Sequence, residues 1–154
     1  MFKFDGSTIT ALLVDAGTGS TNASSIIDTP FGVIWTCYTS TVGNEYYIYD
    51  GSTVQLLADM NPGSANGPTG AHVATASKLY FAGEATSSKG RELYQYDGTA
   101  ISLVADVWPG FKDSRPELLM AHNDTVYFVA EYWNQDYLYR YDGSNLTQVI
   151  KLPS

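Results

Sequence analysis

The sequence feature that most constrains the fold is an Asp-Gly pair, which the chain contains four times at nearly constant spacing. The pairs begin at Asp5, Asp50, Asp97 and Asp142, and each stands between an aromatic residue and a serine or threonine. Successive aspartates lie 45, 47 and 45 residues apart. Because a fixed period of this length is typical of repeat architectures, the chain is expected to consist of copies of one structural unit.

Each period contains four apolar segments whose composition favours β-strands. In the period that carries Asp97 they span residues 72–75, 79–83, 94–96 and 101–105. The third segment has the pattern Tyr-x-Tyr and runs into the Asp-Gly pair, which is a strong signal for a two-residue hairpin with two positive-φ residues. The predicted structural turns are Asp5-Gly6, Asp50-Gly51, Asp97-Gly98 and Asp142-Gly143.

The connections within a period are short, but the connection between periods is long, at residues 59–70 and 106–116. Four strands at a spacing of about 4.8 Å form a sheet roughly 14 Å wide, which such a connection must cross to reach the next sheet. This pattern predicts an all-β fold, a β-propeller-like array of three four-stranded antiparallel blades of about 46 residues plus an amino-terminal half blade. The half blade is expected at residues 1–15 and the blades roughly at 16–60, 61–107 and 108–154. An ordinary β-sandwich is the alternative fold.

Composition excludes several classes of function. The 154 residues include 16 acidic and 8 basic side chains, and the resulting net charge of -8 disfavours binding to nucleic acid or to anionic membrane surfaces. No run of 18 apolar residues exists, so no membrane insertion is expected. No secretory signal is expected either, because Met1 runs straight into a repeat. The single cysteine, Cys37, excludes an internal disulfide framework.

The residues around the third Asp-Gly pair resemble a known repeat family. The segment Glu92-Leu93-Tyr94-Gln95-Tyr96-Asp97-Gly98-Thr99 is similar to the motif that names the ELWxxDGT-repeat (hyalin-like) proteins, with Tyr94 in place of tryptophan. Residues 59–64 and 106–110 fit the same pattern, and the resemblance covers nearly the whole chain. It implies a propeller-like repeat array in an extracellular or cell-surface bacterial protein, and it implies no catalytic residues.

The count of segments leaves one half blade unmatched. The third and fourth segments occur four times but the first and second only three times, so residues 2–14 form a spare outer hairpin. Three blades are too few to close a ring of ordinary geometry, and folded proteins normally cover unpaired sheet edges. Either the chain is a piece of a longer array, or copies of it associate. For the isolated chain we expect a homo-oligomer, a dimer that closes a six- or seven-bladed ring.

Four aromatic residues in loops are the candidate binding residues. Trp108 and Phe111 lie in the second long connection, and Tyr132 and Trp133 occupy the bend after residues 126–130. Large aromatic side chains in loops are common in sugar-stacking platforms and in protein interfaces. They predict a protein or glycan ligand, and the structural alternative is that they cap the core between blades.

No catalytic residue, metal site or cofactor is predicted. Asp15, Asp59 and Asp106 recur just after the fourth segment and are weak calcium candidates, because calcium prefers several oxygen ligands. Capping of the long connection is the favoured interpretation of these aspartates. His72 and His122 fall at different positions of the repeat and therefore do not form a recurring ligand set.

The leading functional hypothesis is a non-enzymatic β-propeller binding or assembly module. It self-associates to complete a ring and presents its loops to a protein or glycan. One alternative is a fragment of a larger propeller hydrolase, whose carboxylates would be Glu84 and Glu131 near the ends of two second segments. These two positions lie a blade apart, which counts against a shared site. A purely structural, self-assembling repeat is the third hypothesis.

Overall fold

Every regular element that the computed structural model describes is a β-strand. The described residues are 1–12, 22–86 and 88–153, and within them no helix could cross a membrane. Sheet order follows chain order, with one two-stranded and three four-stranded antiparallel sheets. The strands are β1 (Phe2–Phe4), β2 (Ile9–Ala11), β3 (Ala23–Thr29), β4 (Gly32–Thr39), β5 (Gly43–Tyr49), β6 (Val54–Leu56), β7 (Pro68–Ala74), β8 (Leu79–Gly83), β9 (Glu92–Tyr96), β10 (Ile101–Ala105), β11 (Glu117–His122), β12 (Thr125–Tyr132), β13 (Gln135–Tyr141) and β14 (Leu146–Lys151).

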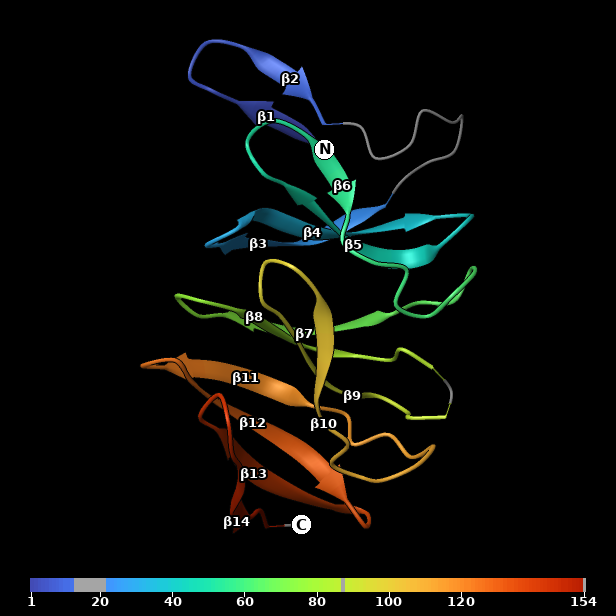
Figure 1. Ribbon diagram of the computed structural model, residues 1–154, viewed down its shortest axis with the longest axis vertical. Coiled ribbons are helices and arrows are strands. Elements are labelled where there is room, and N and C mark those ends of the chain that lie inside the picture. Colours follow the sequence, from blue (N-terminus) through green and yellow to red (C-terminus); the bar gives the residue numbers. More distant parts are fainter. Residues whose placement is uncertain (13–21, 87, 154) are drawn as a thin grey trace.

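The sheets stack face to face in chain order, with the N-terminal hairpin at one end and β11–β14 at the other (Figure 1). The first strands of the four-stranded sheets, β3, β7 and β11, contact one another in sequence. Each sheet is therefore a blade that runs outward from a shared line of inner strands. This arrangement confirms the predicted array of three meander blades and a half blade.

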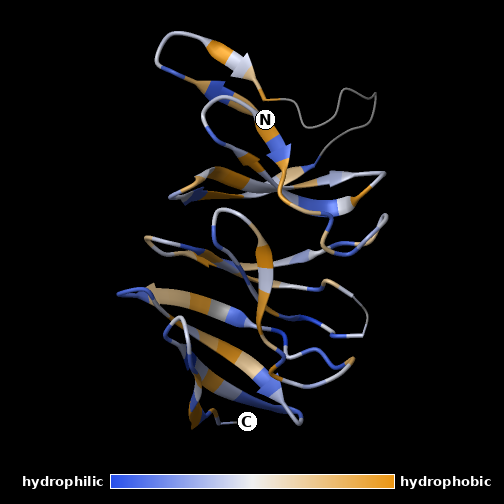
Figure 2. Cartoon of the chain, in the orientation of Figure 1, coloured by the Kyte–Doolittle hydropathy of each residue, from blue (hydrophilic) through white to orange (hydrophobic). Residues whose placement is uncertain are grey.

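Two apolar layers hold the blades together. Between the first and second blades, Ile34 and Tyr46 pack against Phe81 and Tyr94, and the Tyr46 and Phe81 rings meet edge to face at 4.9 Å. Between the second and third blades, the main contacts involve residues Tyr80, Leu93, Val126, Phe128, Tyr139 and Tyr141. Because side chains alternate across a strand, the central strands of the second blade, β8 and β9, supply residues to both layers. Hydrophobic segments accordingly recur through the stack (Figure 2).

The Asp-Gly hairpins form where the sequence predicts them, but their turn type differs from the prediction. Only the glycines have positive φ, such as 101° at Gly51 and 93° at Gly98. The aspartate keeps negative φ because its carboxylate binds the turn: Asp50 Oδ1 accepts the backbone N–H groups of Ser52 and Thr53, both at 2.8 Å. The carboxylate thus satisfies two backbone amides of the turn, which favours this turn over the predicted turn with two positive-φ residues.

Two-residue turns with two positive-φ residues occur elsewhere in the third blade. Asn123 and Asp124 join β11 to β12, with φ of 47° and 59°. Trp133 and Asn134 join β12 to β13, with φ of 54° and 57°. These dihedrals are those of a type I′ hairpin, which asparagine and aspartate tolerate and tryptophan does not favour.

Candidate functional site

The four aromatic residues that the sequence singles out gather at one end of the third blade. Trp108, in the connection between β10 and β11, lies 6.5 Å from Tyr132 and 6.3 Å from Trp133, measured between ring centroids. Tyr132 and Trp133 are themselves 6.3 Å apart and edge to face. Lys112 Nζ lies 5.6 Å from the Trp108 ring centroid and 5.3 Å from that of Phe111, within the range of a cation–π contact.

A hollow of about 300 Å³ opens beside Trp108 and Phe111. Tyr132 and Trp133 contact Trp108 but are not among the residues that line the hollow. The volume of the hollow falls at the lower end of the range for sites that hold small molecules. One side of the hollow is aromatic, and polar groups form the remainder. Its lining residues are Trp108, Phe111, Lys112, Asp113, Arg115, Glu131 and Asn134.

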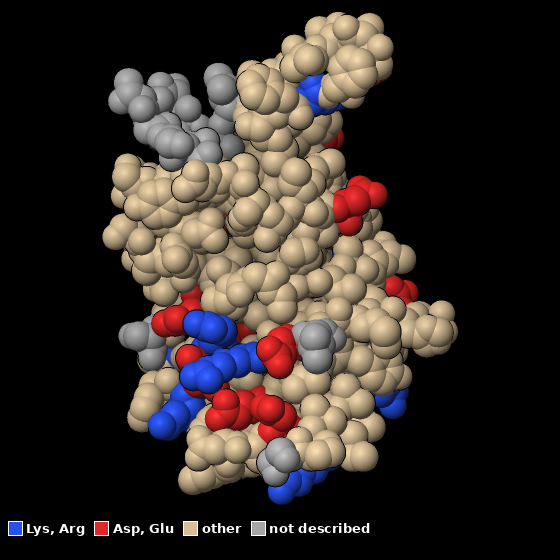
Figure 3. All heavy atoms as spheres, turned by 180° about the vertical axis from the view of Figure 1, so that it is seen from behind, with Lys and Arg blue, Asp and Glu red and all other residues tan. Residues whose placement is uncertain are grey.

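We call this hollow the aromatic groove. The charges of its polar lining residues balance. Arg115 Nη1 lies 3.8 Å from Glu131 Oε2, and Arg115 Nε lies 4.0 Å from Asp113 Oδ2. Figure 3 shows basic and acidic side chains side by side over the last two blades. Two cationic and two anionic groups line the groove, Lys112 and Arg115 against Asp113 and Glu131. The groove therefore offers hydrogen-bond donors and acceptors without a net charge.

Trp133 is held in an unfavourable backbone conformation with its ring exposed. Its φ of 54° lies in the left-handed region, and 71% of the residue surface is exposed. Phe111 is similarly exposed at 72%. A bulky residue with positive φ stores strain of about 1–3 kcal/mol, and such strain is concentrated at ligand sites. The two rings therefore do not act as buried caps of the core, which was the structural alternative.

The sequence did not single out a second feature, in which a buried glutamate fixes each long connection. Glu45 on β5 and Glu92 on β9 are fully buried and occupy the same position, five residues before an Asp-Gly pair. Each follows a glycine two residues earlier, Gly43 or Gly90, whose backbone touches the connection. We call this pair of positions the Gly-x-Glu seat.

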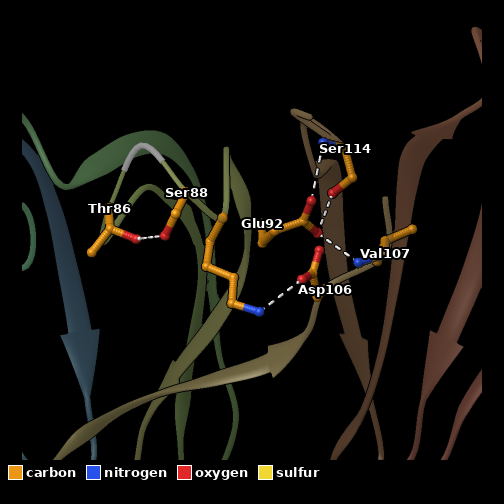
Figure 4. Close-up of polar contacts among 7 residues, drawn as sticks. Thr86, Ser88, Glu92, Asp106, Val107 and Ser114 are labelled. Carbon is orange, nitrogen blue, oxygen red and sulfur yellow. Dashed lines mark hydrogen bonds and ion pairs between the residues drawn. The ribbon is translucent and has the colours of Figure 1, made fainter. Parts of the chain in front are cut away.

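Glu92 holds the connection between the second and third blades at two places. Its Oε2 accepts the backbone N–H of Val107 at 2.8 Å and the hydroxyl of Ser114 at 2.6 Å, and its Oε1 accepts the Ser114 N–H at 3.3 Å. Figure 4 shows the carboxylate between Val107 and Ser114, with Asp106 beside it. Asp106 in turn pairs with Lys89 at 3.0 Å. The connection is thereby fastened to the blade that it leaves.

Glu45 occupies the equivalent place below the first long connection. Burial raises the pKa of Glu45, and the amides of Met60, Asn61 and Gly67 oppose this rise, although none of them makes a regular hydrogen bond to its carboxylate. Gly67 is the counterpart of Ser114, and a Cβ atom on Gly67 would lie 2.6 Å from Glu45 Oε2. The absence of a side chain at residue 67 lets the connection approach, but it also removes the hydroxyl that Ser114 supplies.

Burial dominates the electrostatics of both glutamates. Desolvation raises the pKa of Glu45 and of Glu92 to about 7, and the nearby Asp59 or Asp106 contributes in the same direction. The amide donors oppose this shift but do not overcome it. Tyr137 stands at the third equivalent position, so the seat is absent from the third blade. The signal was present in the sequence as Gly-x-Glu at residues 43–45 and 90–92, which are 47 residues apart.

Of the calcium candidates that the structure describes, Asp59 caps its connection and Asp106 forms an ion pair. Asp59 Oδ2 accepts the Gly63 N–H at 3.3 Å, and Asp106 binds Lys89. Asp15 lies outside the described residues. Within the described ranges no group of three or more His, Cys, Asp or Glu side chains is placed to hold a metal ion.

The turn aspartates bind their own hairpins. The pKa of Asp5, Asp50, Asp97 and Asp142 is lowered chiefly by the backbone N–H of the third residue after each of them.

The remaining candidates have local partners or lie apart. His72 Nδ1 lies 2.8 Å from the Gly70 carbonyl oxygen on β7, and His122 Nε2 lies 3.1 Å from the Asn123 side-chain nitrogen at the end of β11. Glu84 and Glu131 belong to different blades, and only Glu131 lines the aromatic groove. The two glutamates with raised pKa are buried beneath the connections and do not line the groove.

The fold defined by these sheets is that of a β-propeller. A solved structure with a similar arrangement is the β-propeller domain of the Trilobed protease from Pyrococcus furiosus, which is described as having an open velcro topology. The two chains align with a TM-score of 0.54 and 14% sequence identity, over 80% of this chain and 40% of that chain. At this identity the likeness concerns the fold alone. No protein-family model matches the sequence, and no curated protein matches it.

Proposed function

We propose that this chain is a non-enzymatic β-propeller module that binds a neutral glycan in its aromatic groove and self-associates through its ends. The observation that carries the binding proposal is that Trp108, from the connection between β10 and β11, meets Tyr132 and Trp133, at the β12–β13 hairpin, beside a hollow of about 300 Å³. Repeat architecture of the ELWxxDGT type is part of the same proposal. It rests on residues 92–99 and on the recurring long connection.

A sugar ligand fits this groove better than a protein ligand does. Pyranose rings present an apolar face of C–H groups that packs on an aromatic ring, and their edges carry hydroxyl groups that both donate and accept hydrogen bonds. Trp108 and Phe111 supply rings that line the groove, and the exposed Trp133 ring adjoins Trp108. Asp113, Glu131 and Arg115 supply acceptors and donors. Since the four charged groups of the groove cancel, its net charge neither attracts nor repels a ligand. An uncharged sugar therefore suits it.

Binding of soluble oligosaccharides tests the proposal. Cellohexaose, maltohexaose and xylohexaose are titrated into the 154-residue chain by calorimetry, with trigalacturonate as a charged comparison. We expect at least one neutral oligosaccharide to bind, and Trp133→Ala to weaken it by about tenfold, because the exposed Trp133 ring extends the stacking surface next to Trp108 and such an aromatic contact contributes about 1–2 kcal/mol. Tyr38→Ala is the matched control, since Tyr38 is also an exposed aromatic residue but lies on β4.

The controls separate the proposal from its alternatives. If no neutral oligosaccharide binds, or if Trp133→Ala binds as tightly as Tyr38→Ala, the groove is not a glycan site. If trigalacturonate alone binds, the ligand is anionic and the proposed charge balance is wrong. Cleavage of a bound oligosaccharide by the wild-type chain would replace the binding module with the hydrolase alternative.

A further inference from the structure

We infer that the two ends of the blade stack pair head to tail with those of a second copy, which deepens the assembly part of the proposed function. Each end exposes an apolar face. Phe2, Phe4 and Ile9 on the N-terminal hairpin are 73%, 67% and 69% exposed. Met120 and Ile150 on the last blade are both 57% exposed. Figure 2 shows hydrophobic residues on β1–β2 and on β14, at opposite ends of the stack.

The direction of the N-terminal face follows from Lys3. Its Nζ contacts the Tyr49 hydroxyl at 3.3 Å and lies 5.4 Å from the Tyr49 ring centroid, so Lys3 faces the first blade. Because neighbouring residues of a strand point to opposite sides, Phe2 and Phe4 point away from the stack. Ile9 pairs with Phe4 across the hairpin and shares its side. We call Phe2, Phe4 and Ile9 the N-face.

The strand register defines the opposite face. Residues Val126, Phe128, Tyr139 and Tyr141 pack on the second blade, so the alternate residues of β12 and β13 point outward. Among these are Tyr127 and Leu138, which are half-buried. Tyr127 pairs with Met120 and Leu138 pairs with Ile150, which places all four side chains on one side. We call Met120, Tyr127, Leu138 and Ile150 the C-face.

These two faces repeat the surfaces that are joined inside the molecule. Tyr127 in the third blade is equivalent to Tyr80 in the second. Each pairs with the residue before the tyrosine of an Asp-Gly turn, Arg140 or Gln95. Phe4 precedes Asp5 as Tyr141 precedes Asp142. Tyr80 and Tyr141 meet edge to face at 6.0 Å between the second and third blades. The same contact between chains brings Tyr127 of one copy against Phe4 of the other.

The occupant of the C-face is thus argued from continuity with the blade junctions of this chain. At each internal junction the outward face of one blade is covered by the Tyr-x-Tyr face of the next. In the second blade, Tyr94 and Tyr96 retain only 4% and 7% exposure. Phe2 and Phe4 carry the corresponding aromatic positions and are left uncovered. A head-to-tail contact either closes a ring or propagates, because the two surfaces differ.

Complementation between two variants tests this inference. Phe4→Asp removes the N-face and keeps the C-face, whereas Tyr127→Asp removes the C-face and keeps the N-face. In sedimentation velocity, we expect the wild-type chain to exceed its 16.8 kDa monomer mass and each variant alone to be monomeric. An equimolar mixture of the two variants should form a one-to-one heterodimer, since one intact pair of faces remains. Far-UV circular dichroism verifies that both variants are folded.

The other outcomes overturn the inference. A monomeric wild-type chain contradicts it directly. If Phe4→Asp alone still dimerises, the C-faces pair with each other; if Tyr127→Asp alone does, the N-faces pair. Phe111→Asp is the matched control, because it places a charge on an equally exposed aromatic position in the groove and should leave assembly intact. If Phe111→Asp assembles normally but no longer binds glycan, assembly and glycan binding are independent. Either proposal can then fail without the other.

Discussion

At the scale of single residues, two positions combine a structural cost with a specific role. Trp133 has an exposed ring in the left-handed region, and Glu92 has a carboxylate without access to water. Both depart from what their residue types favour. In each case the unfavourable feature is confined to one residue. A single substitution can therefore test its effect on stability separately from its effect on the site.

Replacement of Trp133 by asparagine should stabilise the chain and remove ligand binding. Asparagine tolerates positive φ, and the exposed tryptophan ring contributes little burial, so we expect the free energy of unfolding to rise by about 1 kcal/mol. Urea unfolding measures this change, and calorimetry with the bound oligosaccharide measures the loss of affinity. A Trp133→Asn variant that is less stable than the wild type would show that the ring contributes more to packing than its exposure indicates.

The buried Glu92 should make stability depend on pH. Its native pKa of about 7 exceeds the ordinary value of 4.5, so between these values the native state binds more protons than the unfolded state. The free energy of unfolding therefore falls as pH rises from about 4.5 to 7, by on the order of 1 kcal/mol per unit of pKa difference. Glu45 adds a decrease of the same sign.

Glu92→Gln should flatten this dependence. The amide keeps the shape of the side chain and an acceptor for the Val107 N–H, but it carries no charge to desolvate. Urea unfolding at pH 4.5 and pH 8 should give a smaller difference for the variant than for the wild type. Glu117→Gln, an exposed change of the same kind, is the control. An unchanged difference in Glu92→Gln would mean that Glu92 is solvated.

At the scale of elements, the long connections are fixed parts of the fold. A single residue joins each connection to two blades. Ser114 donates its N–H to the Arg91 carbonyl oxygen at 3.0 Å and accepts the Glu131 N–H at 2.7 Å. Gly67 makes the same pair of bonds to Asn44 and Glu84, at 3.2 and 2.7 Å. Since the connection between β10 and β11 also carries Trp108 and Phe111, the seat that fixes it positions the aromatic groove.

Substitution of Gly90 tests this role of the seat. Gly90 has φ of 65°, and its added Cβ would meet the Lys112 carbonyl of the connection, well inside van der Waals contact. Gly110 also has positive φ, at 95°, but an added Cβ there would meet nothing within 4 Å. Both Gly90→Ala and Gly110→Ala carry backbone strain, and Gly90→Ala should cost about 1–3 kcal/mol more because of the clash. Equal losses in urea unfolding would show that the connection yields without cost.

At the scale of the whole molecule, the chain is a stack with two unlike ends. Every internal junction joins an outward face to a Tyr-x-Tyr face, and the N-face and C-face are the same two kinds of surface, exposed at the two ends of the described stack. Head-to-tail pairing therefore extends a rule that the molecule already follows twice. Such pairing would also bring several aromatic grooves into one assembly.

The sequence alone determined the architecture, because repeat spacing and alternation are local properties of the chain. Four Asp-Gly pairs, the Tyr-x-Tyr segments and the long connections sufficed to predict the blades and the half blade. They also predicted Trp108, Phe111, Tyr132 and Trp133 in loops, which is wrong for Tyr132, the last residue of β12. Spacing could not reveal that these residues converge, since Trp108 and Trp133 lie 25 residues apart in different connections.

Only the tertiary structure decided which polar groups are buried. Glutamate is a residue type usually found at the surface. Glu92 is buried because Val107 and Ser114 approach it from the next connection and hydrogen-bond to its carboxylate. The turn type at Asp50 was likewise decided by where its carboxylate points. Desolvation and hydrogen bonding depend on neighbours distant in sequence, whereas strand pattern depends on adjacent residues. For that reason the repeat could be read from the sequence, and the seat and the aromatic groove required the fold.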